Sequence, residues 1–107
     1  MNRRVVVTGL GIVSCLGNSA EAVTRSLHEG KSGISTRQEH IEMGMRSHVA
    51  GAPEIDIPSH IDRKQLRFMG DAASYAYISM QQAIEDSGLE DADVSNVRTG
   101  IIAAVSY

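Results

Sequence analysis

The sequence predicts an α/β fold with parallel strands, and three segments support that prediction. Residues 5–7 are consecutive valines and residues 99–105 form a second apolar run, a pattern typical of strands buried on both faces. Between them, residues 71–87 repeat apolar side chains at helical spacing. Because parallel strands are joined through a crossing helix, this alternation indicates a parallel sheet. The length of 107 residues allows one small domain, residues 1–107.

A helix is expected between the valine strand and Gly30. Asn18 or Ser19 can cap its first turn, and Glu21 stands in capping-box register with Asn18. Gly30 supplies the stop, because glycine takes the left-handed conformation that ends many helices. The side that this helix is expected to bury holds Ala20, Val23 and Leu27.

The middle of the chain predicts shorter elements. Residues 35–44 are mostly polar, and we predict irregular structure there, followed by a short edge strand within residues 47–52. Asp62 and Gln65 repeat the capping-box spacing. They predict a short helix that begins at Arg63.

The clearest helix is expected at residues 71–87. Gly70 separates it from the shorter helix, and Gly88 followed by Leu89 predicts a left-handed cap with its apolar partner. An acidic loop, residues 90–96, then leads to the second strand. The helix face expected to pack against the sheet holds Ala73, Ala76, Met80, Ala83 and Ile84.

The composition is that of an ordinary globular protein and argues against several classes. Net charge is -3, so no nucleic-acid-binding surface is expected. No apolar run approaches the roughly 20 residues of a membrane span, and only three valines follow Arg4 before Thr8, too few for a signal peptide. Cys15 is the single cysteine, which excludes an internal disulfide and suits a cytoplasmic protein.

Gly9, Gly11 and Gly17 allow two interpretations. A dinucleotide-binding turn needs the pattern Gly-x-Gly-x-x-Gly running straight into a helix. Here Ser14 occupies the third glycine position, and the predicted helix cap comes too late for that pattern. The favoured interpretation is a tight turn where strand and helix pack closely, and the alternative is a small nucleotide-binding α/β domain.

Neither the cysteine nor the histidines form a recognisable catalytic or metal-binding pattern. A nucleophilic cysteine needs a basic partner or a helix N-terminus that favours the thiolate, whereas Cys15 stands in an apolar loop. We therefore interpret Cys15 as a buried small apolar residue. The histidines lack metal-ligand spacing, so no metal site is predicted; they are His28, His40, His48 and His60.

Arg63, Lys64 and Arg67 are the most suggestive group of side chains. Arg63 and Arg67 are four residues apart and share a helix face, with Lys64 beside them. Cations in the first turns of a helix oppose its dipole, at a cost of about 0.3–1 kcal/mol each when exposed. This placement leaves two interpretations equally open: attraction of an acidic partner, or a solvated basic turn with Arg67 paired to Asp71.

Several stretches of the sequence resemble the β-ketoacyl-acyl carrier protein synthases (3-oxoacyl-ACP synthases). They follow one another in the order of that family and cover nearly the whole chain. They are VTGLGIVS at 7–14 with LGN at 16–18, EGKSGI at 29–34, GMRSHV at 44–49 and IDRKQLRFM at 61–69. The last two make the chain most similar to an N-terminal fragment of the type I synthases of bacterial fatty-acid biosynthesis.

The resemblance implies a fold and an activity. The fold is thiolase-like, and this chain would supply the N-terminal part of the first α/β half of a layered αβαβα architecture. The activity is that of a homodimeric acyltransferase without metal or organic cofactor, which elongates acyl chains by decarboxylative Claisen condensation with malonyl-ACP. A Cys thiolate and two His perform that chemistry. Cys15 does not match the nucleophile motif, so no catalytic residue is predicted in this chain.

One functional element of the family does match. In type I synthases the basic residues matching Arg63, Lys64 and Arg67 form part of the docking surface for the acidic acyl carrier protein, which favours the partner interpretation. The glycine-rich turn of the family is missing at residues 104–107, so we expect a truncation, a frameshift or a divergent junction. We therefore expect an inactive, marginally folded piece of a synthase or, alternatively, a non-catalytic module that binds acyl carrier protein.

Overall fold

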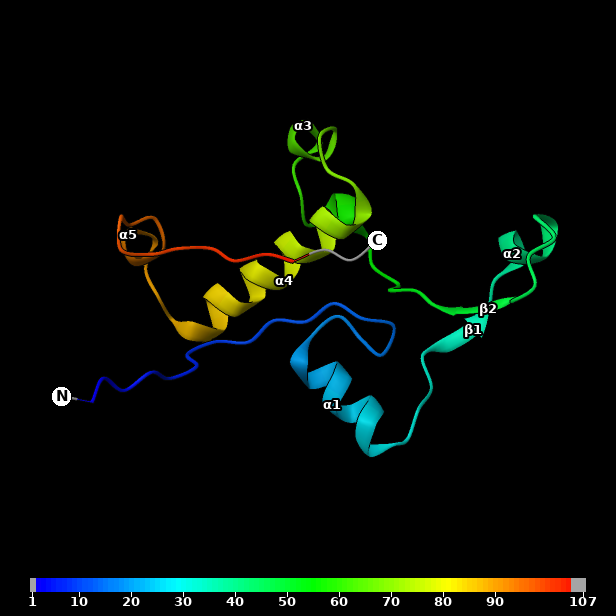
Figure 1. The fold of residues 1–107 in the computed structure, drawn as a ribbon, viewed down its shortest axis with the longest axis horizontal. Coiled ribbons are helices and arrows are strands. Elements are labelled where there is room, and N and C mark those ends of the chain that lie inside the picture. Colours follow the sequence, from blue (N-terminus) through cyan, green and yellow to red (C-terminus); the bar gives the residue numbers. More distant parts are fainter. Residues whose placement is uncertain (1, 105–107) are drawn as a thin grey trace. The chain divides into compact units, whose positions relative to one another are not determined.

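The computed structural model describes residues 2–104, which divide into two compact units. Residues 12–56 form one unit, and residues 2–11 with residues 57–104 form the other. Figure 1 labels the helices and strands along the chain. They are α1 (Ala20–His28), β1 (Ile34–Thr36), α2 (Gln38–Glu42), β2 (Val49–Gly51), α3 (Arg63–Leu66), α4 (Asp71–Ser87) and α5 (Asp91–Val94). A 3-10 turn without a label, η1 (Ile57–Ser59), precedes α3.

α1 begins and ends where the sequence predicts. The Ser19 hydroxyl accepts a hydrogen bond from Ala22 N at 3.1 Å, so Ser19 rather than Asn18 is the cap. Gly30 follows the helix with a left-handed φ of 64°, which confirms the expected stop. Both ends of α1 therefore depend on local backbone chemistry that the sequence displays.

The buried side of α1 differs from the expected one. Leu27 and Ala20 are exposed and Val23 is only half-buried, whereas Ser26 is buried. The Ser26 hydroxyl donates to Leu16 O at 2.7 Å and ties the helix to the turn before it. The inward side of α1 therefore includes Val23 and Ser26, and the hydrogen bond to Leu16 O satisfies the buried hydroxyl.

A small antiparallel hairpin follows α1 in the same unit. β1 pairs with β2 in a register that places Ile34 opposite Gly51, and Arg37 N donates to His48 O at 2.7 Å just beyond the strands. β2 confirms the edge strand predicted within residues 47–52. The prediction of irregular structure for residues 35–44 is wrong, because pairing with a distant segment creates β1 and leaves α2 between the strands.

α4 has the predicted bounds and is the longest helix of residues 2–104. Gly70 is its N-cap residue, and Gly88 ends it with a left-handed φ of 70°, as expected. Its buried residues are Ser74 and Ile78, which corrects the predicted packing face. Ser74 is accommodated because its hydroxyl donates to Gly70 O at 3.0 Å. The members of the predicted face are exposed or half-buried instead: Ala73, Ala76, Met80, Ala83 and Ile84.

The two predicted strands are extended but unpaired, so the expected parallel sheet is not formed by residues 2–104. Residues 5–7 and 99–104 join no strand there, and Val5 and Ile102 are 93% and 97% exposed. Val105, also assigned to the second strand, lies outside the described residues. β-branched side chains favour an extended backbone, but a sheet also needs a neighbour that completes the hydrogen-bond ladder. The directions of these segments are as predicted, since in Figure 1 the blue and red segments run in one direction and α4 runs back, but the sheet within residues 2–104 is the antiparallel pair β1 and β2.

Candidate functional site

The three predicted site residues lie together on α3 and on the residue that follows it. We call residues 62–68 the α3 turn. The Asp62 carboxylate accepts from Lys64 N at 3.5 Å, and its carbonyl accepts from Leu66 N at 2.9 Å, so one residue holds the turn at two points. Ile61, only 3% exposed, fixes the segment just before this cap. The predicted cap and the predicted start at Arg63 are confirmed.

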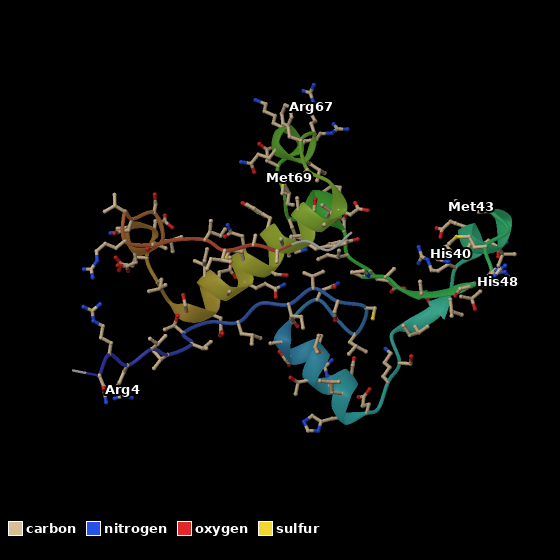
Figure 2. All side chains as sticks on the ribbon, in the orientation of Figure 1. Arg4, His40, Met43, His48, Arg67 and Met69 are labelled. Carbon is tan, nitrogen blue, oxygen red and sulfur yellow. The ribbon has the colours of Figure 1, made fainter. Side chains whose placement is uncertain are left out.

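Arg63, Lys64 and Arg67 are exposed and have no ionic partner within residues 2–104. The ion pairs there join an arginine and a glutamate of α1, at 3.4 Å, and an arginine and a glutamate beside α2, at 3.3 Å. The alternative pairing of Arg67 with Asp71 is not formed. Figure 2 shows Arg67 at the outer end of α3, directed away from α4. We call these three side chains the basic cluster.

The basic cluster creates a region of positive electrostatic potential on a chain whose net charge is negative. Its three cations lie within five consecutive positions, whereas the chain as a whole carries a net charge of -3. Because α3 is a single turn, its dipole is small, and the cost of holding cations there is correspondingly small. Exposed charges act over about 8–10 Å at moderate ionic strength. The cluster can therefore attract an acidic surface that the remainder of the chain would repel.

Cys15 lies in a turn whose residues are half-buried. Residues 14–17 form the Cys15 turn, which Ser14 and Gly17 close by two backbone hydrogen bonds of 2.9 and 3.2 Å. Cys15 is half-buried, and a Cβ built at Gly33 or Gly51 would lie 2.6 or 2.9 Å from its sulfur. The packing role predicted for Cys15 agrees with these contacts, although its burial is only partial. α1 begins several residues later, so the thiol does not stand at a helix N-terminus.

A hollow of about 440 Å³ lies over α4 in the unit of residues 2–11 and 57–104. Met80, Ala83 and Ile84 line it from α4, and the extended segments contribute Gly9 and Ile101 among others. The helix face that the sequence predicts to be packed therefore borders an open apolar hollow. The shared face of these α4 residues was the only sequence signal for this feature.

Gly9 and Gly11 lie against the middle of α4, which argues against the nucleotide-binding alternative. A Cβ at Gly9 would overlap Ala83 O, and a Cβ at Gly11 would overlap Ser79 O. These carbonyls belong to the helix interior, whereas a bound phosphate needs free N–H groups at a helix N-terminus. The predicted close packing of backbone on helix is confirmed at these two glycines.

The part of the chain that the structure describes offers neither a metal site nor a membrane-spanning helix. No group of three or more His, Cys, Asp or Glu side chains in residues 2–104 could hold a metal ion. Over the same residues, no helix combines the length and the hydropathy needed to cross a membrane. The basic cluster is thus the strongest candidate site among the described residues.

Comparison with known proteins identifies close relatives. Residues 2–107 match the family described as beta-ketoacyl synthase, N-terminal domain. The 3-oxoacyl-(acyl-carrier-protein) synthase 1 of Haemophilus influenzae is 58% identical over 100 residues, which cover 94% of this chain and 25% of that protein. Proteins of the same name from Escherichia coli K12 and Buchnera aphidicola subsp. Baizongia pistaciae are 53% identical over 102 residues and 50% identical over 106 residues. Their alignments cover 94% and 97% of this chain, and 25% and 26% of those proteins.

The chain therefore spans about a quarter of the length of the curated relatives that it matches. The similarity to type I synthases, predicted from four sequence stretches, is confirmed by relatives that are 50% to 58% identical. The match to the family extends over nearly all of the chain. This chain belongs to the β-ketoacyl synthase family, as part of its N-terminal domain.

Proposed function

We propose that this chain supplies the acyl-carrier-protein docking surface of a β-ketoacyl-ACP synthase of fatty-acid biosynthesis. The observation that supports this proposal is the basic cluster, three exposed cations on the α3 turn for which residues 2–104 supply no ionic partner. The names of the relatives specify acyl carrier protein, and the carrier protein is acidic in the family that this sequence resembles. Opposite charges on the two surfaces would steer their encounter and fix its orientation.

The cluster would act mainly through attraction at a distance and through short contacts at the rim of the interface. The two arginines can each offer a planar fork of donors to a carboxylate, whereas Lys64 offers a compact point charge. An exposed ion pair contributes only about 0.2–1 kcal/mol, so no single cation is expected to dominate. Binding should therefore depend on the group and should weaken as salt is added.

We further propose that the whole protein is a cytoplasmic homodimeric acyltransferase that works without metal or organic cofactor. The family resemblance implies decarboxylative Claisen condensation of an acyl group with malonyl-ACP through a Cys thiolate and two His. Cys15 is half-buried against Gly33 and Gly51, and its sequence context does not match the nucleophile motif of the family. The chain of residues 1–107 is therefore expected to bind carrier protein without catalysing condensation.

The test is a calorimetric titration of the 107-residue chain with acyl carrier protein at about 50 and about 250 mM salt, concentrations across which screening changes substantially. We expect affinity to fall with salt, and the triple variant Arg63→Glu, Lys64→Glu, Arg67→Glu to bind at least about 100-fold more weakly, since it replaces attraction with repulsion.

The matched control reverses three other exposed cations, Arg3→Glu, Arg4→Glu and Arg98→Glu, and changes the net charge by the same amount. It should bind nearly as well as the unmodified chain. Equal losses in the two triple variants would contradict a localised docking surface, because net charge alone would then explain the binding.

A further inference from the structure

The α3 turn also presents an exposed aromatic side chain beside the basic cluster. Phe68 is the only phenylalanine of the chain and is 89% exposed. Isolated exposed apolar residues are common, so exposure alone would mean little. Phe68, however, directly follows Arg67, and the neighbouring Met69 is half-buried. One turn thus presents an exposed apolar side chain together with three cations that form no ion pair within residues 2–104.

The backbone under Phe68 is held by a succession of hydrogen bonds. Phe68 N donates to Gln65 O at 3.0 Å, and Met69 N donates to Leu66 O at 3.1 Å, so the tight turning continues past α3. On the other side, Ile61 N donates to Ile57 O at 3.1 Å. Because the backbone of Phe68 is already ordered by these hydrogen bonds, binding through its ring costs little additional backbone entropy, which favours affinity.

We propose that Phe68 is the apolar anchor of the docking surface and inserts into an apolar depression on the acidic carrier protein. This inference rests on the proposed function and names the contact that charge alone does not provide. Aromatic side chains are enriched at interface centres, whereas lysine is depleted there. The arrangement therefore assigns the centre of the contact to Phe68 and its rim to the basic cluster.

A partner of opposite charge fits this surface better than a second copy of the chain. A two-fold contact through Phe68 would bring two copies of the basic cluster face to face, and like charges across an interface are unfavourable. An acidic partner turns the same three cations into attractive contacts. The positive charge around the Phe68 ring therefore favours an acidic partner over a second copy of the chain.

The test separates the two contributions by their response to salt. Binding of acyl carrier protein to the full chain is measured by calorimetry for Phe68→Ala, Phe68→Leu and the control Val97→Ala, a fully exposed apolar residue that does not belong to the α3 turn. We expect Phe68→Ala to weaken binding about tenfold at both low and high salt, because buried apolar area is insensitive to screening. Phe68→Leu should lose less, and Val97→Ala should bind like the unmodified chain.

Several outcomes would overturn the inference. An affinity of Phe68→Ala equal to that of the unmodified chain would do so, as would a loss that disappears at high salt. Retained affinity together with a concentration-dependent dimer that Phe68→Ala dissolves in the ultracentrifuge would identify a second copy as the occupant instead. If the basic-cluster triple variant loses binding and Phe68→Ala does not, the proposed function holds and the role of Phe68 as an anchor is refuted. No binding by the unmodified chain would remove both.

Discussion

The α3 turn and the Cys15 turn differ in backbone and in the exposure of their side chains: the first is a single helical turn, and the second is closed by an antiparallel bridge between Ser14 and Gly17. Both are tight and closed by local hydrogen bonds, at Asp62 in the first and between Ser14 and Gly17 in the second. Hydrogen bonds within the α3 turn hold its backbone, and its three cations and Phe68 are exposed. The Cys15 turn places its side chain against the glycines of the following segments.

This difference separates residues that bind from residues that pack. A free side chain on a fixed backbone can be changed with little effect on folding, whereas an enclosed one cannot. Changes in the α3 turn should therefore alter partner binding at nearly constant stability. Changes around the Cys15 turn should alter stability and leave binding by the folded chain intact.

The largest effect is expected for Gly33→Ala. The added Cβ would lie 2.6 Å from both the carbonyl oxygen and the sulfur of Cys15, and the carbonyl cannot rotate away as a side chain could. We expect the free energy of unfolding, measured in urea, to fall by about 2–3 kcal/mol, as overpacking commonly does. Gly100→Ala is the control, since nothing lies within 4 Å of a Cβ there. Equal stability of the two variants would show that the Cys15 turn is not tightly enclosed.

A smaller effect is expected for Gly51→Ala, with a distinctive rescue. Its Cβ would meet the Cys15 sulfur at 2.9 Å and Ile34 Cδ1 at 3.2 Å, both of them side-chain atoms. We expect a loss of about 1 kcal/mol, most of which Cys15→Ala should recover in a double-mutant cycle. The same substitution should recover little in Gly33→Ala, because the carbonyl remains. Additive losses in both cycles would refute the assignment of the contact to sulfur.

Most features that depend on a few neighbouring residues could be predicted from the sequence; the exception is α5, which Glu90 and Asp93 cap locally and for which the sequence predicts part of an acidic loop. Gly70 and Gly88 bound α4, and Asp62 caps α3, because caps and left-handed glycines act within one turn of the chain. The spacing of the three cations of the basic cluster places them on one turn for the same reason, whereas their role in docking is predicted only by the family resemblance. Their freedom from ion pairs was not predictable, since it depends on where Asp71 lies in space.

Features that depend on distant partners were missed or wrongly predicted. β1 exists because β2 pairs with it, and Ser26 is buried because Leu16 O accepts its hydrogen bond. The valines of residues 5–7 carry the composition of a buried strand, but composition specifies neither a hydrogen-bonding neighbour nor a covering layer. The apolar hollow over α4 could not be predicted for the same reason. The spacing of apolar residues identifies a helix face that can be buried, but it does not identify the segment that buries it.

The smallest effect on stability is expected for Arg67→Gln. Arg67 is exposed and has no ionic partner within residues 2–104, so its neutral replacement should change the free energy of unfolding by less than about 0.5 kcal/mol. Its affinity for acyl carrier protein should nevertheless fall about two- to fivefold at low salt, with a shallower salt dependence, because one attractive charge is lost. A clear loss of stability without a change in affinity would assign Arg67 to packing and remove the distinction between the two turns. The expected result, lower affinity at unchanged stability, requires that the α3 turn keep its shape without the guanidinium of Arg67. The Asp62 cap predicts that it does, because it holds the backbone without that side chain.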